Sequence, residues 1–565
     1  MLRPQAIGHV PDETARIARA AFPKGHPSLR LADELGALFT DETFAALFPT
    51  YGQPAFAPWR LALVTILQFA EGLADRPAAD AVRGRIDWQY VLRLELADSG
   101  FDASVLSAFR TRLIEGSAAS LLLDTVLRWC REQKLLTSRG RQRTDSTGCP
   151  LGRMLAAVRA LNRLEVVGET MRHVLNSLAV VAPDWRRGHV PPDWVARYDR
   201  RAEDDRLPAA NAARATLALT IGADGYALLR AVNAASTPLW LHEIPAVQTL
   251  RQVWVQHYQL VEGSVQWRVA DNIPLATIVI SSPDDRSSPY DRDAHYAKKR
   301  TTQWVGYKVH LTETCADDLP QLITAVETTP GPTADGEMTP VIHAALAERA
   351  LLPASHLVDT GFLDAALLVS SREDYQVELV GPTRRDYHWQ AREGTGFAVA
   401  QFQVDWEQQH ATCPAGHTSI SWTPAVDKRT NQVIKIKFSS RDCRPCPHRS
   451  QCTRSQVKRP RRTITVRADA EFHALQAARQ REATAAFATA YAKRAGIEGT
   501  LSRGIRTCRL RQIRSIGLAK TRLGGCPLGG MLTAVALNFL RLGEGFADIP
   551  RAKTRRSPFV TLMAA

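Results

Sequence analysis

Three carboxylates spread along the chain have the residue type and the surroundings needed for phosphoryl-transfer chemistry. They are Asp145 in RTDST, Asp359 in HLVDTGF and Glu498 in YAKRAGIEGT. Cleavage and rejoining of a phosphodiester by two metal ions requires those ions to lie roughly 3.5–4 Å apart. Mg²⁺, and likewise Mn²⁺, prefers carboxylate oxygens and keeps positions open for phosphate and water. One carboxylate shared by two ions and one private to each would form such a site, so we expect all three to bind Mg²⁺ or Mn²⁺.

The segments around these carboxylates predict how they are positioned. The HLV run before Asp359 reads as a strand and the Thr-Gly pair after it favours a turn, so Asp359 is expected at the carboxyl end of a strand, where α/β proteins form sites. A long helix predicted near 468–500 would carry Glu498 at its end. Arg494 lies one turn before Glu498 and Tyr491 nearly two turns before it, so the three should share one face.

Each of these residues also has an ordinary structural interpretation. An Asp at a strand-to-turn junction often only stabilises the turn. Arg494 and Glu498 are spaced as an i,i+4 surface pair, which contributes only about 0.2–0.5 kcal/mol. Competing carboxylates are Asp291, Asp293 and Asp364, of which Asp293 is the strongest, although its surroundings, PYDRDAHYAKKR, read as a charged loop.

Four cysteines late in the chain have the composition of a metal site. They lie in TCPAGH and DCRPCPHRSQC, and they are Cys413, Cys443, Cys446 and Cys452. Four thiolates suffice for a tetrahedral Zn²⁺ that is structural because no position is left open. The alternative is four reduced thiols, and His417 or His448 could replace one ligand. Nine Cys in 565 residues argue against a disulfide-stapled secreted protein and favour a reducing cytoplasm.

The charge of the chain favours a polyanionic partner. Lys and Arg number 72 against 57 acidic residues, which gives a net charge of +15 and suits nucleic acid or an anionic membrane surface. A basic segment follows Glu498 and is expected to contact DNA backbone, although such runs are often only solvated surfaces. Its members are Arg503, Arg506, Arg509, Arg511, Arg514, Lys520 and Arg522. A second basic stretch, VKRPRRT, contains Lys458, Arg459, Arg461 and Arg462.

The pattern of apolar residues predicts an α/β protein with added helical parts. Residues 1–135 read as helices, near 59–75, 77–95 and 103–115, with Asp102 as an N-cap, and form either a DNA-binding module or a plain bundle. A helix is expected over 151–181. From about 303 the period changes to strands, with a helix near 336–350 and a further one at 528–542. The start of the chain has no apolar leader and no run approaches 18 apolar residues, so a cytoplasmic, nucleoid-associated protein is expected.

Taken together, these segments resemble the DDE transposases of bacterial insertion sequences. The resemblance is closest to the group with an InsH-type helical N-terminal domain, an RNase H-like catalytic core and a late tyrosine–arginine–glutamate signature. It covers about residues 40–545. The segments that carry it are GRQRTDST, LAAVRALNRLEVVGETMR, SPYDRDAHYAKKRTTQWVGYKVHLTETC, HLVDTGF, YAKRAGIEGTLSRGIR and RQIRSIGLAKT.

The resemblance implies an activity, a partner and a division of the chain. The activity is metal-dependent cleavage at element ends followed by strand transfer into target DNA, by a homodimer on double-stranded DNA. Tyr491 and Arg494 would contact the backbone of the element end. The wider signature has a Lys seven positions after the Glu, where this chain has Ile505, so Arg503, Arg506 or Lys520 would take that role.

The implied division is a helical domain at 1–135, a catalytic core at 136–545 and a tail at 546–565. The core would carry a helical insertion at about 150–275 and a Cys-bearing insertion at 380–465. Two other functions are open to such a sequence. One is a DNA-binding protein descended from a transposase, and the other is a basic zinc nuclease or RNA-binding enzyme, which would need open His or Cys ligation near the acids.

Overall fold

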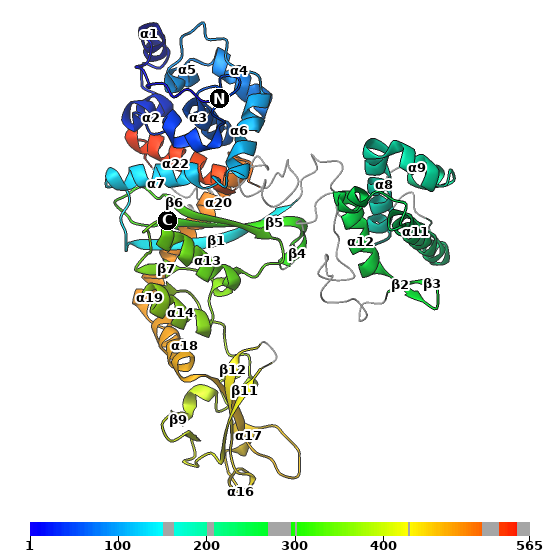
Figure 1. Ribbon diagram of the computed structural model, residues 1–565. Coiled ribbons are helices and arrows are strands. Elements are labelled where there is room, and N and C mark those ends of the chain that lie inside the picture. Colours follow the sequence, from blue (N-terminus) through cyan, green and yellow to red (C-terminus); the bar gives the residue numbers. More distant parts are fainter. Residues whose placement is uncertain are drawn as a thin grey trace.

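The computed structural model describes residues 1–150, 163–199, 208, 210–268, 295–299, 302–427, 430–510 and 530–550. The chain is a mixed α/β protein in which helices lie above a central sheet and a smaller β-rich part lies below it (Figure 1). No helix in these ranges combines the length and apolar character that crossing a bilayer requires.

The N-terminal part is helical, as predicted. Its helices are α1 (Asp12–Ala21), α2 (Pro27–Leu35), α3 (Pro58–Ala70), α4 (Asp75–Gly84), α5 (Ile86–Leu92), α6 (Ser104–Glu115) and α7 (Leu121–Glu132). Every residue of α3 except Arg60 is buried, which is the behaviour of a helix that is apolar on all sides. Ala103 is the N-cap residue of α6, but Asp102 still accepts hydrogen bonds from the backbone N–H and the hydroxyl of Ser104.

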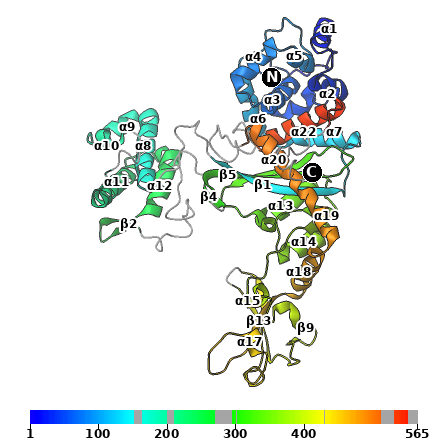
Figure 2. The same ribbon diagram turned by 180° about the vertical axis from the view of Figure 1, so that it is seen from behind.

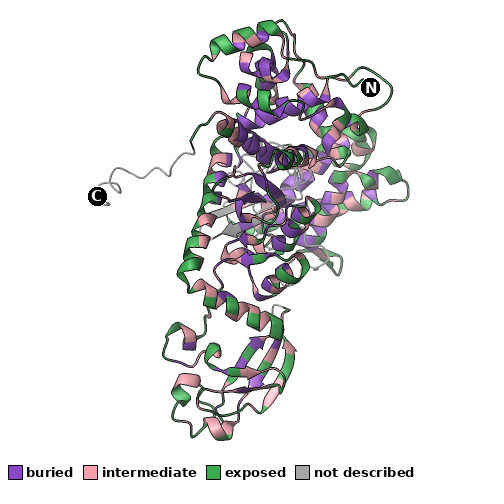
Figure 3. Cartoon of the chain, turned by 90° about the vertical axis from the view of Figure 1, so that its left-hand side faces the viewer, coloured by how far each residue is buried: buried purple, intermediate pink, exposed green. Residues whose placement is uncertain are grey.

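A helix from the far end of the chain completes this helical part. The apolar helix predicted at 528–542 is α22 (Gly530–Phe546), which lies among α2, α3 and α7 (Figure 2). One hydrophobic cluster runs from these helices through α22 into the sheet. Figure 3 shows buried positions continuing from the helical part into the sheet. The helices of residues 1–135 therefore share their core with the sheet and with α22.

The central sheet has antiparallel and parallel strands. Its strands are β1 (Arg141–Pro150), β4 (His295–Lys299), β5 (Thr302–Thr314), β6 (Ile323–Pro330), β7 (Ser355–Leu357) and β8 (Glu378–Val380). β5 lies antiparallel to β1, with β4 and β6 both on its other side, while β7 runs parallel to β1 and β8 parallel to β7. The strands predicted after residue 303 and the helix between them, α13 (Asp335–Glu348), are confirmed.

Alternation along β1 sends its side chains to two different sets of helices. Thr144 and Ser146 face α13, because Ser146 donates to Asp335 at 2.9 Å. Arg143 and Asp145 face the opposite side, where α20 (Gly496–Arg506) and α22 lie. The helix α14 (Ala365–Tyr375) connects β7 to β8 and packs against α13.

Two further parts have small cores of their own. The helical insertion contains α8 (Arg163–Val181), α9 (Pro183–His189), α10 (Trp194–Tyr198), α11 (Asn211–Val232), α12 (Pro245–His257) and the hairpin of β2 (Tyr258–Val261) and β3 (Ser264–Trp267). Residues 151–162 of the predicted helix 151–181 lie outside the described residues.

The Cys-bearing part contains β9 (Gln403–Asp405), β10 (His410–Thr412), β11 (Ser421–Val426), β12 (Gln432–Lys437) and β13 (Thr463–Arg467). The short helices α15 (Trp389–Arg392), α16 (Ser440–Cys443) and α17 (Arg449–Cys452) accompany them.

The prediction of a single long helix near 468–500 is wrong. The segment forms α18 (Asp469–Glu482), α19 (Ala485–Ala492), a 3-10 turn η8 (Lys493–Ala495) and then α20. The hydroxyl of Thr484 accepts from the N–H of Phe487 and so caps a new helix, which is the tendency of Thr at such a position. Glu498 consequently lies in the first turn of α20 and not at the carboxyl end of a long helix.

A buried chain of polar side chains joins α13 to the sheet and makes stability sensitive to pH. His343 and His356 are 2.9 Å apart, and His356 is 2.6 Å from the hydroxyl of Thr144. Burial lowers the pKa of His343 to about 4, and burial together with His343 lowers the pKa of His356 well below its ordinary value. Since the unfolded chain then binds more protons, stability is present above pH 6.5 and is lost as the pH falls toward 4.

We therefore expect protonation of His343 alone to lower the free energy of unfolding by on the order of 3 kcal/mol as the pH falls from 6.5 to about 4. His343→Gln, which can hydrogen-bond without titrating there, should flatten the curve measured by urea denaturation at several pH values. His473→Gln, on the exposed side of α18, is the control and should follow the wild-type curve. An unchanged slope in His343→Gln would contradict the assignment.

Candidate active site

The sheet brings Asp145 and Asp359 level with each other. Arg143 of β1 pairs with Leu357 of β7 in parallel register, and each Asp follows two residues later in the chain. Neighbouring strands lie about 4.8 Å apart, so the two carboxylates emerge side by side. Asp359 lies just beyond the end of β7, as predicted, and serves as the N-cap of a 3-10 turn, η6 (Thr360–Phe362).

Each aspartate has one oxygen held by the backbone and the other directed at the same cation. Oδ1 of Asp145 accepts from the N–H of Ser146 at 2.7 Å, and Oδ1 of Asp359 accepts from the N–H of Gly361 at 2.8 Å. The Oδ2 atoms lie 2.9 Å and 3.9 Å from Nη2 of Arg494. These backbone bonds fix both carboxylates so that two oxygens converge on one position.

Arg494 is the centre of the predicted constellation. Its Nη1 lies 3.4 Å from Oε1 of Glu498, so its guanidinium contacts all three carboxylates. Burial works to lower the pKa of Arg494, but Asp145 and the neighbouring acidic groups raise it overall. The side chain of Glu498 is 66% exposed against 12% for Arg494, so Glu498 approaches from the solvent side.

Tyr491 lies beside this group. Burial, as the largest cause, raises its pKa, and the nearby Asp359, Asp145 and Glu498 raise it further against the lowering effect of Arg494. Its ring stacks on Phe487 with 5.4 Å between centroids and 9° between planes. All five residues predicted from the carboxylates and the signature, namely Asp145, Asp359, Tyr491, Arg494 and Glu498, are thus brought together in the fold.

A buried ion network fixes α20 against the sheet, and sequence reasoning missed it. Glu313 of β5 is fully buried and lies 2.6 Å from Arg143 and 2.8 Å from Arg541 of α22. Its second oxygen also accepts from Thr500 of α20 at 2.7 Å. Arg143 donates to the carbonyl of Lys493, the residue before Arg494. A signal was present, because Arg143 lies two residues before Asp145 and so on the same face of its strand.

Gly496 allows this close approach. A Cβ atom added there would lie 2.2 Å from Nη1 of Arg143, whereas one added at Gly499 would meet nothing within 4 Å. Both glycines lie in the same helix, which makes them a matched pair.

Gly496→Ala is expected to destabilise the fold by about 1–3 kcal/mol, because Arg143 or α20 must move. Gly499→Ala should be neutral or stabilise by up to about 1 kcal/mol, since Ala is the better helix former. Urea denaturation of the two variants checks this. Equal stabilities would show that Arg143 moves aside without cost.

The basic residues after Glu498 have different environments. Both Nη atoms of Arg503 bind Glu544 of α22, at 2.8 and 2.6 Å, whereas Arg506 is exposed. Ile505 packs against the main core, so the position of the signature Lys is apolar and turned inward here. Lys520, with Arg511, Arg514 and Arg522, lies outside the described residues.

The structure describes one of the three competing carboxylates, Asp364. Asp364 is the N-cap of α14 and accepts from the N–H of Leu367 at 2.9 Å, which is an ordinary structural role. Asp291 and Asp293 lie outside the described residues.

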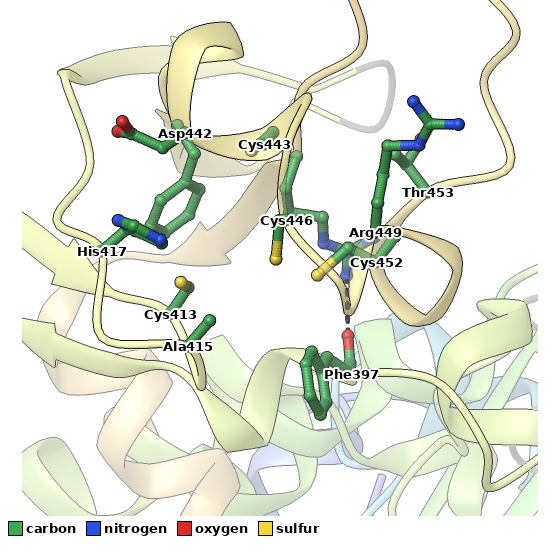
Figure 4. Close-up of a pocket in the computed structure, with 12 residues that line it drawn as sticks. Phe397, Cys413, Ala415, His417, Asp442, Cys443, Cys446, Arg449, Cys452 and Thr453 are labelled. Atoms are coloured by element: carbon green, nitrogen blue, oxygen red, sulfur yellow. Dashed lines mark hydrogen bonds between the residues drawn. The ribbon is translucent and has the colours of Figure 1, made fainter.

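The four predicted cysteines border one pocket in the Cys-bearing part. Figure 4 shows the sulfur atoms of Cys413, Cys446 and Cys452 pointing into the same space, with Cys443 and His417 nearby. The pKa of Cys452 is raised to about 11, mainly by burial; Arg462 opposes this shift and the neighbouring thiols add to it. Within the described ranges, no group of three or more His, Cys, Asp or Glu is arranged to hold a metal ion.

Comparison with known proteins gives two matches. A family model described as a transposase DDE domain matches residues 412–543, and one described as a transposase domain (DUF772) matches residues 16–112. No curated protein and no solved structure matches the chain. The first match contains Tyr491, Arg494 and Glu498, while Asp145 and Asp359 lie outside both. The resemblance to the DDE-type transposases of insertion sequences, inferred from the sequence, is confirmed by these two matches.

Proposed function

We propose that the chain is a DNA transposase that cleaves double-stranded DNA at insertion-sequence ends and joins the freed ends to target DNA, with Asp145, Asp359 and Glu498 as its catalytic residues. The observation that carries this proposal is their convergence on one cation, the Arg494 guanidinium, next to the middle of β1 and the carboxyl end of β7. The strand order β6–β5–β1–β7–β8, with the first three antiparallel and the rest parallel, supports an RNase H-like core.

The donor set fits divalent metal ions. Arg494 stands where positive charge is favoured, and the Oδ2 atoms that face it are hard oxygen donors on short, backbone-fixed side chains. When bound, Mg²⁺ or Mn²⁺ would polarise the scissile phosphate and favour the ionised form of the attacking hydroxyl. Asp145 and Asp359 would hold these ions from the sheet. Glu498, longer and exposed, would reach in from α20.

Contacts with DNA form a second part of the proposal. Tyr491, Arg494 and Arg506 lie next to or just after the site, and Lys520 follows in the chain. A planar guanidinium matches phosphate oxygens. Arg503 is already paired with Glu544. We therefore propose that Arg503 supports DNA binding mainly by fixing α20 to α22. The helices of residues 1–135 would add DNA contacts of their own, and a homodimer would hold two element ends together.

We also propose the chain divisions given above. Residues 1–135 share the main hydrophobic cluster with the catalytic core, so the two insertions are the divisions that the hydrophobic clusters support. The insertion cores at 150–275 and 380–465 are separate from the main cluster.

The test is a cleavage assay on the DNA that flanks the gene, with Mg²⁺, comparing wild type with Glu498→Ala. Nicking at a defined end that needs metal and is lost in the variant is the expected result. End-specific binding without cleavage by either protein would favour a DNA-binding descendant of a transposase. Absence of binding would contradict the proposal.

We also propose that Cys413, Cys443, Cys446 and Cys452 hold a structural Zn²⁺, since these four thiols border one pocket. Purified protein should contain about one zinc per chain, measured by elemental analysis. Cys446→Ser should lose the zinc and lower the melting temperature, while Cys130→Ser, at a buried thiol of α7, should keep the zinc. Zinc retained in Cys446→Ser would contradict the ligand set.

A further inference from the structure

We infer that Arg494 is an internal counter-cation that competes with divalent metal ions for Asp145 and Asp359, so that the same side chain leaves the carboxylates when metal binds and becomes available to a DNA phosphate. This inference rests on the proposed function and deepens it, because it assigns Arg494 a task before DNA is bound.

The carboxylate oxygens that face the site are the ones that Arg494 contacts. The Oδ1 atoms of both aspartates are engaged by backbone N–H groups at 2.7 and 2.8 Å. The Oδ2 atoms, which are left to face the site, are those that lie 2.9 and 3.9 Å from Nη2 of Arg494. A divalent ion that binds both Oδ2 atoms must therefore take the position of the guanidinium.

A simple surface pair with Glu498 does not describe Arg494. The side chain is only 12% exposed, and its nearest carboxylate is Asp145, which belongs to a strand far away in sequence. A surface i,i+4 pair would instead leave both partners in solvent and contribute little. Arg494 balances charge that would otherwise be repulsive within the site.

The backbone around Arg494 is held by contacts that do not involve the Arg494 side chain. Arg143 holds the carbonyl of Lys493, and η8 separates α19 from α20 at this residue. An arginine displaced from the carboxylates stays charged, because no physiological pH neutralises it. The anion that the proposed substrate brings to the same place is a phosphate, and a guanidinium binds phosphate in a two-pronged geometry. Metal binding and DNA contact are thereby coupled, and linkage requires the coupling to be reciprocal.

Calorimetric titration of the DNA-free, full-length chain with Mn²⁺ tests the inference. Arg494→Gln should bind Mn²⁺ at least about tenfold more tightly than wild type, because the competing cation is gone. Arg187→Gln is the matched control, since it removes an arginine from an exposed pair with Asp184. It should bind like wild type. The variant with both Asp145→Asn and Asp359→Asn gives the background from other sites.

The outcomes separate the two proposals. Equal or weaker binding by Arg494→Gln, with binding that still depends on the two aspartates, overturns this inference and leaves the proposed function standing. Binding that never depends on the aspartates contradicts the proposed metal site itself. Circular dichroism checks folding. If Arg494→Gln does not fold, Arg494→Lys, which keeps the charge but cannot bridge two carboxylates with a planar fork, must bind Mn²⁺ more tightly than wild type.

Discussion

Glu313→Gln is expected to lower the free energy of unfolding by about 3–5 kcal/mol, because removal of one partner from a buried ion network leaves charges without compensation. Here two guanidiniums, those of Arg143 and Arg541, would lose their shared counter-charge at a fully buried position. Chemical denaturation with guanidinium chloride or urea measures the change. The loss should exceed that of any surface substitution, since those usually fall within about 0.5 kcal/mol.

The matched control is Glu13→Gln, which makes the same chemical change in an exposed pair with Arg16 of α1. No measurable loss is expected there. If Glu313→Gln proved as stable as Glu13→Gln, the network would not hold α20, and the account of how Glu498 is positioned would fail.

Asp145→Asn and Asp359→Asn are each expected to lower the rate of end cleavage by a factor on the order of 10³ or more, since charge stabilisation by bound metal contributes several kcal/mol to the barrier. The measurement is a single-turnover cleavage rate on DNA carrying the element end. Asn keeps the shape of the side chain and can still accept from the backbone N–H, so folding should be retained.

Asp364→Asn is the control for these variants. Asp364 lies five residues after Asp359 and caps α14, and Asn caps helices about as well as Asp. Its cleavage rate should equal that of wild type. A loss in Asp364→Asn as large as in Asp359→Asn would show that the assay reports the local fold and not the site.

The site was largely predictable because its residues lie in segments with strong local patterns. The HLV run placed Asp359 at a strand end, and the spacing of Tyr491, Arg494 and Glu498 placed them together. The break at Thr484 was missed because apolar and helix-forming residues continue on both sides of it, while a single side-chain cap decides the boundary. The position of Glu498 in the first turn of α20 could not be predicted either, because it depends on where the long helical segment breaks.

Contacts between distant segments were beyond the reach of local pattern. Nothing near Glu313 in sequence indicates that Arg143 and Arg541 will meet it, because that depends on the pairing of β1 with β5 and on the packing of α22. Arg494 was expected to contact DNA, and its contact with Asp145 likewise depends on tertiary structure.

The position of α22 has a consequence for how the protein is made. This helix fills the space among α2, α3 and α7, and at Gly543 an added Cβ would lie 3.1 Å from the carbonyl of Pro27. Until the ribosome has synthesised residues 530–546, the first helices of a nascent chain present the apolar surface that α22 will cover. A fragment ending at residue 135 would keep that surface exposed, and exposed apolar patches promote aggregation. The helices α2, α3 and α7 are therefore synthesised well before α22 but reach their final packing only after it.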